Sequence, residues 1–407
     1  MRLKMLALLL LLLFFCTPVS GETLPRLELT TPRLNYFVYK DGTLSVTEAL
    51  GTTETFSVRA RYRGSTSAFY EGKRNYRLTL TEEGTPLKRS LLGLRKDDDW
   101  LLDGMYGDLS RLRNRMAMEL WDSFYRLPWT DASGAIHGSM AELWFDGSYK
   151  GLYALNERLD RKQLGLSGEG GRIYKTFNPS MDGVDLTDFE QADLTLPDEE
   201  SATWYNVELN WKGSEGASWD CFTDFRRFVA EADDDLFAAQ VDRYLDLDNC
   251  ADYYLFINML GCTDNMCKNM VFCVRDVRED GRLYLIPWDL DACMGRLYDN
   301  QPASADVVCT NGLFERLKRL PAFNELLKQR YAELRNGALS PASVRQAMTK
   351  YTELYEASGV IEREQERFTV YRNALTGEEI PLSLREEWDY MLTWLEQRYE
   401  WLDGIYL

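Results

Sequence analysis

The chain has 407 residues, and its 47 Lys and Arg residues are outnumbered by 65 Asp and Glu residues, which gives a formal net charge of −18 at pH 7. A protein that binds nucleic acid through phosphate contacts normally carries a basic excess, so the charge argues against a nucleic-acid partner. Apolar residues make up 45% of the chain, which excludes a protein that is mainly disordered.

Histidine occurs once, as His137. A hydrolase with a Ser-His-Asp or Cys-His arrangement would have to use this residue as its base, and a zinc site with two or three histidines is excluded. Carboxylates are therefore the expected acid–base and metal-binding groups of an active site.

The N-terminus has the pattern of a secretory signal peptide. Two basic residues precede an apolar run at 5–16 that is too short to span a bilayer, and small residues at 19–21 suit cleavage. We expect residues 1–21 to be removed on export, with no stable membrane insertion of the chain afterwards.

Three Asp-Gly pairs lie between β-rich runs, and each predicts the turn of a hairpin: Asp41-Gly42, Asp146-Gly147 and Asp280-Gly281. A helix is predicted before the second pair, because apolar residues recur at 112, 116 and 120. Glu119 lies on the apolar face of that helix.

From residue 221 onward the pattern is mainly helical. A buried helix is predicted at 248–260, capped by Asp248 or Asn249, and a long amphipathic helix at 384–402. Residues 179–200 and 211–219 are polar and contain glycine, so we expect loops there.

Seven cysteines lie between residues 221 and 309. An exported protein can pair some of them, so disulfides and buried free thiols both stay open. Cys262 and Cys267 could form a disulfide that rigidifies the loop between them, whereas a metal site there is disfavoured because no histidine lies nearby.

The segment 261–295 combines several chemically active residue types. Asp264 opens a short loop, Asn269 follows five residues later, and a predicted hairpin leads to Asp289 and Asp291. Phosphoryl transfer needs a base for the attacking hydroxyl and oxygen ligands for a metal, and protein kinases use this spacing and order. Taken singly, each residue is more often a structural cap or turn residue than a catalytic one.

Other segments carry a recognisable pattern. They lie at residues 63–67 (RGSTS), 73–78 (KRNYRL), 91–121, 147–161 (GSYKGLYALNERLDR) and 287–291 (PWDLD). In this order they resemble the spore-coat protein H (CotH) family of atypical, secreted protein kinases. The resemblance covers nearly all of the chain after the expected signal peptide.

The resemblance implies an α+β, two-lobed fold like that of protein kinases. A β-rich N-terminal lobe would span residues 22–160. A mostly helical C-terminal lobe with the catalytic loop and metal-binding hairpin would span 161–340, and a helical extension packed on it would span 341–407.

The resemblance also implies roles for individual residues. Asp264 would be the catalytic base, and Lys73 would contact the ATP phosphates, with Arg77 as the second choice. The remaining implied site residues are a phosphate-covering loop at Arg63, Gly64 and Ser65, a residue near the lobe-connecting hinge at Glu157, and metal ligands at Asn269 and at Asp289 or Asp291.

Glu119 is a separate inference. The phosphate-binding lysine of a kinase is usually held by a carboxylate on the first helix, and Glu119 is on the predicted first helix. A glutamate at a helix edge with its charge in solvent is the equally supported alternative.

The function implied is an extracytoplasmic protein kinase that uses ATP and Mg²⁺ or Mn²⁺ to phosphorylate Ser or Thr of a spore-coat or envelope protein. The acidic composition favours a basic, Ser-rich protein substrate by charge complementarity. A nucleotidyl transferase on the same scaffold and a non-catalytic surface or spore-coat assembly module stay open, and a glycosidase with two carboxylates is a weaker alternative.

Overall fold

The computed structural model describes residues 23–64, 67, 70, 72–177, 197, 201–204, 206–214, 219–373 and 376–407. The expected signal peptide and most of the loop predicted at 179–200 lie outside the described residues. Within the described residues, no helix combines the length and the apolar character required to cross a bilayer.

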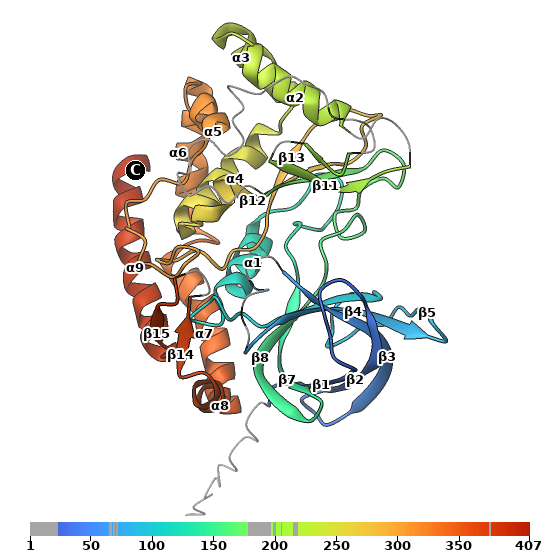
Figure 1. The fold of residues 1–407 in the computed structure, drawn as a ribbon. Helices are drawn as coiled ribbons and strands as arrows, with labels where there is room; N and C mark the ends of the chain where they lie inside the picture. The colour runs from blue at the N-terminus through green and yellow to red at the C-terminus, as the bar shows by residue number, and fades with distance from the viewer. Residues whose placement is uncertain are drawn as a thin grey trace, which may run out of the picture.

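The N-terminal region forms a closed β-barrel of seven strands. The strands are β1 (Arg26–Thr30), β2 (Lys40–Thr47), β3 (Thr53–Arg63), β4 (Asn75–Glu82), β6 (Asp99–Asp103), β7 (Gly138–Phe145) and β8 (Ser148–Asn156), with the short β5 (Thr85–Pro86) beside β4. The order is β3-β2-β1-β7-β8-β6-β4, and β4 pairs back with β3 to close the ring. Figure 1 shows the barrel below the helical region.

Alternation along the strands separates the barrel core from its outer face. In β3, Val58 and Ala60 are buried, while Arg59, Arg61 and Arg63 take the alternate positions and are more exposed. Because successive strand residues point to opposite faces, these three arginines lie on the outside. The buried residues include Leu27, Leu44, Leu78, Trp100, Leu143 and Leu155, which together fill the barrel.

The expected two-lobed protein-kinase-like fold is wrong. The described residues form a closed seven-stranded barrel, a separate five-stranded sheet and nine α-helices. Closure depends on the antiparallel β3–β4 pair and on the parallel pairing of β1 with β7, whose partners Leu27 and Leu143 are distant in sequence. No local hydrophobic pattern reports such a pairing, so the sequence suggested only a β-rich region.

Of the three predicted hairpin turns, two are confirmed. Asp146-Gly147 joins β7 to β8 with φ values of +49° and +73°, as a tight hairpin requires, and Gly281 lies in the loop between β12 and β13. Asp41-Gly42 is instead inside β2. A Cβ at Gly42 would lie 2.2 Å from the carbonyl oxygen of Thr30, so the glycine permits close strand approach rather than a turn.

The second region combines helices with a sheet ordered β10-β11-β9-β12-β13. Its elements are β9 (Arg172–Phe177), β10 (Thr203–Trp204), β11 (Val207–Lys212), α2 (Asp220–Glu231), α3 (Asp234–Gln240), η2 (Val241–Arg243), α4 (Leu247–Leu260), η3 (Thr263–Met266), β12 (Lys268–Val274), β13 (Tyr284–Pro287), α5 (Gly312–Leu317) and α6 (Pro321–Asn336). The buried helix predicted at 248–260 is confirmed as α4, although its cap is Asp246, whose side chain accepts from the Asn249 amide. The loop predicted at 211–219 begins inside β11.

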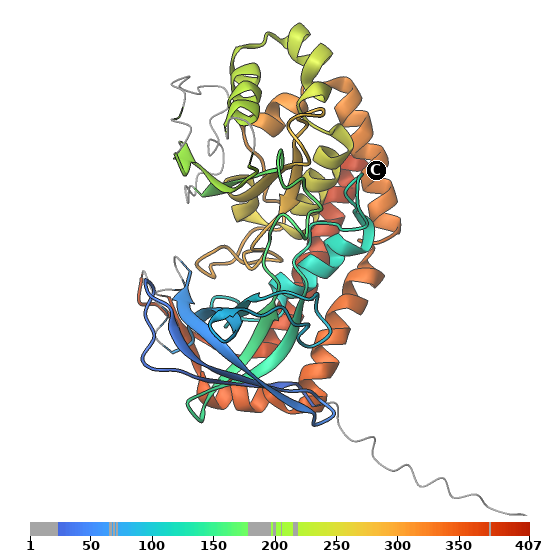
Figure 2. The same cartoon turned by 90° about the vertical axis from the view of Figure 1, so that its right-hand side faces the viewer.

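One helix from between two barrel strands and three C-terminal helices lie along the two regions. They are α1 (Arg113–Phe124), α7 (Pro341–Ser358), α8 (Val360–Arg367) and α9 (Leu384–Tyr406), with β14 (Val370–Arg372) and β15 (Glu379–Pro381) between α8 and α9. The predicted helices at 112–120 and 384–402 are confirmed as α1 and α9. Figure 2 shows the C-terminal helices along one side of the molecule, from the helical region down to the barrel, where α8 packs on β8.

Candidate active site

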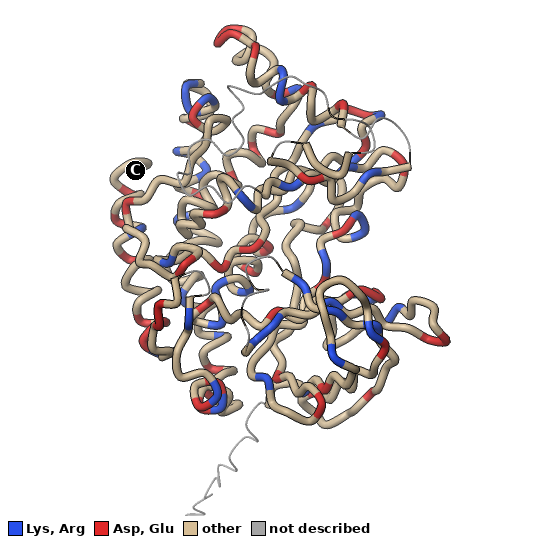
Figure 3. Tube along the Cα trace, viewed as in Figure 1, with Lys and Arg blue, Asp and Glu red and all other residues tan. Residues whose placement is uncertain are grey.

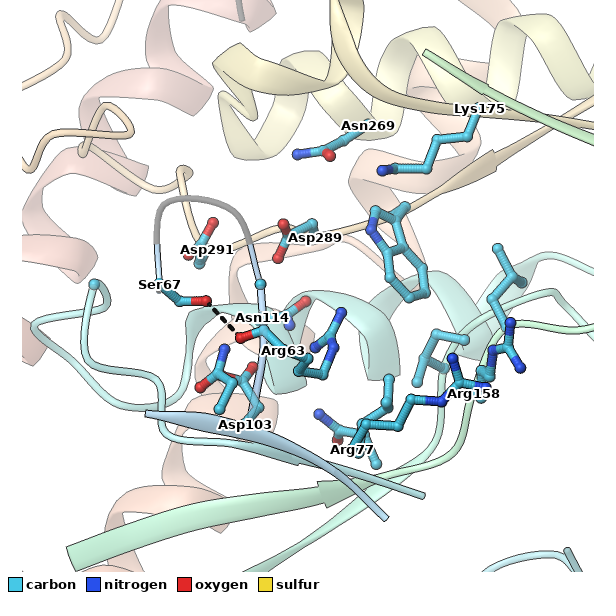
Figure 4. Close-up of a pocket in the computed structure, with 18 of the residues that line it drawn as sticks. Arg63, Ser67, Arg77, Asp103, Asn114, Arg158, Lys175, Asn269, Asp289 and Asp291 are labelled. Carbon is cyan, nitrogen blue, oxygen red and sulfur yellow. Dashed lines mark hydrogen bonds between the residues drawn. The ribbon is translucent and has the colours of Figure 1, made fainter. Parts of the chain in front are cut away.

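A cavity of about 610 Å³ lies between the outer face of the barrel and the segments that follow α4 and β13. Figure 4 shows Asn269 and Lys175 on one side, Arg63 and Asp103 on the other, with Asp289 between them. The cavity therefore has a barrel wall, formed by β3, β4, β6 and β8, and a carboxylate wall, formed by η3, β12 and the residues after β13.

The strand register explains the barrel wall. Arg61 pairs with Arg77, Arg77 with Leu101, and Leu101 with Asn156. Residues paired across neighbouring strands point to the same face, and all four line the cavity. Asp103, two residues after Leu101 on β6, belongs to the same face and also lines the cavity.

The arginines of the barrel wall differ in their partners. Arg77 Nη2 lies 2.6 Å from Asp99 Oδ2, and Arg158 Nη1 lies 2.8 Å from the same oxygen. Arg63 forms no salt bridge with a described residue, although its charge acts on the nearby Asp103 and opposes the burial that raises the pKa of that carboxyl. Its guanidinium is therefore the one of these three whose charge is available to an anion in the cavity.

The sharp end of α4 positions Asp264. Gly261 has a φ of +63°, and a Cβ there would lie 2.4 Å from the Trp394 ring, so only glycine fits. The chain then turns into the short helix η3, which carries Asp264 to the cavity.

The segment from Trp288 to Asp291 is held from two sides. Asn265 donates from Nδ2 to the Trp288 carbonyl at 2.7 Å, and Asn114 on α1 accepts from the Leu290 amide at 3.1 Å. Asp289 has a φ of +56°, a left-handed conformation that is uncommon outside glycine. Such backbone strain is often found at functional sites, where the surrounding structure enforces it.

The carboxylates of the cavity raise one another's pKa. Burial raises the pKa of Asp264, and Asp289 adds to this, although Lys268 Nζ, 3.5 Å from Asp264 Oδ2, opposes it. Burial and then repulsion by Asp289 and Asp264 raise the pKa of Asp291 well above its usual range. Burial also raises the pKa of Asp103, with a further contribution from Asp289. This concentration of negative charge favours a bound cation.

The donors present fit a hard divalent cation. Within the described residues, no three Asp, Glu, His or Cys side chains are arranged so that they could hold a metal by themselves. Mg²⁺ is usually bound by one or two carboxylates together with substrate phosphates and waters, so a complete protein cage is not required. Asn269, Asp289 and Asp291 all line the cavity, where they would supply the protein's share of such oxygen ligands.

Lys73, predicted to contact phosphate, is not at the cavity. Its side chain is fully buried and forms an ion pair with Glu364 of α8. Glu364 also accepts from Arg111 Nε and from the Leu152 amide, each at 2.8 Å. Burial lowers the pKa of Lys73 to about 7 while Glu364 opposes that effect. Lys73 therefore anchors α8 to the barrel, and the cations that line the cavity are others.

The proposed partner of Lys73 was Glu119, and this is wrong. Glu119 Oε1 instead accepts from Tyr351 at 2.6 Å and Lys350 at 2.8 Å, both on α7. The reason is that the side of α1 that carries Glu119 faces α7 rather than the barrel.

The remaining predicted cofactor-binding residues divide between the cavity and its surroundings. Arg63, Gly64 and Arg77 line the cavity, whereas Ser65 lies outside the described residues. Glu157 is buried and does not line the cavity. Its side chain accepts a hydrogen bond from the Arg95 amide at 2.9 Å, so Glu157 supports the end of β8.

All seven cysteines among the described residues are free thiols. The Cys262–Cys267 disulfide considered from the sequence is therefore absent from this structure. Both thiols are buried, and burial raises their pKa, so they are unreactive packing groups.

The sequence interpretation missed Asp103, Asn114 and Lys268, all of which line the cavity. Asp103 could be found only by knowing that the outer face of β6 forms a wall. Lys268 directly precedes Asn269 and was the easiest to detect.

The chain matches the model of a known protein family. A family model described as CotH kinase protein matches residues 60–402, which is most of the chain and includes both walls of the cavity. A comparison with curated proteins finds no match.

Proposed function

The chain belongs to the CotH kinase protein family, and on this basis we propose that it transfers the γ-phosphate of ATP to Ser or Thr of a protein. The observation that carries the proposal is the cavity itself. It places Asp264 and the oxygen donors Asn269, Asp289 and Asp291 opposite an arginine of the barrel that has no ion-pair partner among the described residues. Phosphoryl transfer needs a base, a metal site and cations for the phosphates.

Each wall would have its own task. Arg63 would bind phosphate oxygens from the barrel side, as a charge-assisted hydrogen-bond donor. Lys268, held beside Asp264, would keep a positive charge next to the transferring group, because nearby carboxylates raise its pKa. Asn269 with Asp289 or Asp291 would hold Mg²⁺, which neutralises phosphate charge when bound.

The chemistry requires one proton transfer and one displacement. The acceptor hydroxyl oxygen forms a bond to the γ-phosphorus, and the bond from that phosphorus to the β–γ bridging oxygen breaks, which releases ADP. The hydroxyl proton passes to the Asp264 carboxylate. Burial raises the pKa of that carboxyl, which makes it a better proton acceptor when ionised.

The test is transfer of label from γ-labelled ATP with Mg²⁺ or Mn²⁺ to a mixture of Ser-containing acceptor proteins. We expect transfer by the unmodified protein and a loss of about 10²- to 10⁴-fold in the Asp264→Asn variant, the usual contribution of a general base. Asp389→Asn, an exposed aspartate on α9, is the matched control and should keep full activity. Activity that survives Asp264→Asn would contradict the proposed role of Asp264.

The same assay with α-labelled ATP separates phosphoryl from nucleotidyl transfer. Label on the acceptor from the α-position alone would replace the kinase proposal with nucleotidyl transfer. No label from either position, together with no metal-dependent ATP binding by calorimetry, would favour a non-catalytic assembly module.

A further inference from the structure

An exposed surface adjoins the barrel wall of the cavity. It consists of Phe37, Val38 and Tyr39 in the loop before β2 and Arg59 and Arg61 on β3, and we call it the rim surface. It is continuous with the cavity because Arg61 itself lines the cavity, as does Tyr36 next to Phe37.

The rim surface carries more positive than negative charge. Arg59, Arg61 and the next outward residue, Arg63, occupy alternate positions on one strand face, and none of them forms an ion pair with a described residue. Asp41 is opposite Arg59 in the strand register and forms no salt bridge with it, although its charge offsets part of the positive charge of the row. Figure 3 shows Lys and Arg positions on the barrel strands that face the rest of the molecule. In a chain of net charge −18, such a row favours an anionic partner.

The arginines are held in place by aromatic and backbone contacts. The guanidinium carbons of Arg59 and Arg61 lie 5.7 Å and 5.1 Å from the Tyr39 ring centroid. Arg61 Nη1 donates to the Tyr36 carbonyl at 2.7 Å, and its Nε is buried without a hydrogen-bond partner among the described residues. The row is therefore preorganised before a partner binds.

An apolar group is presented beside this row. The side chain of Phe37 is 91% exposed and that of Val38 is 55% exposed. The loop that carries them is ordered, because Asn35 Oδ1 accepts from both amides at 2.8 Å and the Asn35 carbonyl accepts from the Tyr62 amide of β3 at 3.0 Å. An exposed aromatic side chain on an ordered loop, next to arginines without salt-bridge partners, is a feature of protein-binding surfaces.

We propose that the rim surface binds the protein substrate and selects an acceptor Ser or Thr in an acidic segment that also carries an apolar side chain. This rests on the proposed function for the identity of the partner. It reverses the expectation of a basic substrate, which came from net charge. The charge that a substrate segment meets on the rim surface is local: Arg59 and Arg61 lie there, whereas the carboxylate wall lies across the cavity from Arg61.

The experiment uses two synthetic peptides of equal length, each with one Ser and one Leu, flanked by Asp and Glu in one and by Lys and Arg in the other. Phosphorylation with MgATP gives kcat/KM, and we expect the acidic peptide to be about tenfold better. Arg59→Gln should raise the KM for the acidic peptide about three- to fivefold, the size of one exposed charge interaction, and leave the KM for ATP unchanged. Phe37→Ser should act in the same direction.

Lys328→Gln on α6 is the matched control, since it removes one exposed positive charge far along the chain from the rim surface. Equal rates for the two peptides, or equal effects of Arg59→Gln and Lys328→Gln, would overturn the inference.

Binding without turnover separates this inference from the proposed function. Fluorescence anisotropy of the labelled peptides with the Asp264→Asn variant measures docking alone. Tighter binding of the acidic peptide that Arg59→Gln weakens would support the rim surface even if no phosphate were transferred. Tighter binding of the basic peptide would overturn it even if the kinase activity were established.

Discussion

The two walls of the cavity are constructed differently. The barrel wall places its side chains on regular strands, so the register alone aligns Arg61, Arg77 and Leu101. The carboxylate wall places Asp264 and Asp289 on a short 3₁₀ helix and a strained turn. A strand face gives a broad charged surface, whereas irregular backbone directs a few oxygen atoms to one point, and phosphoryl transfer needs both.

The largest expected effect comes from removing the anchor behind the barrel wall. Glu364→Gln leaves Lys73 and Arg111 buried without a counter-charge, so we expect the free energy of unfolding to fall by about 3–5 kcal/mol. Denaturant unfolding measures this. Glu366→Gln, on the same helix but exposed, should change it little. An equal effect of the two substitutions would mean that the buried pair does not hold α8 to the barrel.

A smaller free-energy change is expected when an arginine of the barrel wall is replaced, and its size should differ between Arg63 and Arg77. Arg63→Ala should raise the KM for ATP by about 10- to 100-fold, because the lost charge-assisted hydrogen bonds are worth about 1.5–3 kcal/mol. Arg77→Ala should raise it less, since Asp99 already neutralises Arg77. Steady-state kinetics over a range of ATP concentrations measures the KM of both variants. A larger increase in Arg77→Ala than in Arg63→Ala would make Arg77 the phosphate ligand.

The carboxylate wall should respond to metal, with a smaller change in stability. Asp291→Asn removes one of the mutually repelling carboxylates, so the metal-free variant should unfold at a temperature about 1 °C higher, which corresponds to about 1 kcal/mol for a chain of this length. The unmodified protein should gain stability from Mg²⁺ with ATP, and the variant should gain less. Thermal unfolding with and without MgATP measures both, and an undiminished gain would assign the metal to Asp289 and Asn269.

The smallest expected change concerns the pKa of His137, a residue that lies outside both walls and serves as a reference. Hydrogen bonding to Asp122 raises the pKa of His137 above its usual value of 6.5. The stabilisation is complete below pH 6.5 and is lost as the pH rises through the folded-state pKa. NMR titration of this only histidine should show the raised pKa, and Asp122→Asn should lower it without changing the KM for ATP. An unchanged pKa in that variant would place its cause elsewhere.

Local sequence patterns predicted the carboxylate wall better than the barrel wall. Asp264, Asn269, Asp289 and Asp291 are close in sequence, so their spacing by itself was informative. The barrel wall depends on pairings between distant strands, and a register cannot be read from one strand alone. For the same reason Lys73 was assigned to the cavity, although its partner Glu364 belongs to a helix near the other end of the chain.

The Lys73–Glu364 pair also has a consequence for the order in which the protein matures. The two residues are 291 positions apart, so a chain made from its N-terminus completes every barrel strand long before α8 exists. Glu364 and Phe368, which both contact Lys73, are made near the end of the chain, so until then the ammonium group lacks its counter-charge and the cover that α8 provides. The contact between the barrel and α8 therefore stabilises the barrel only when nearly the whole polypeptide has been made.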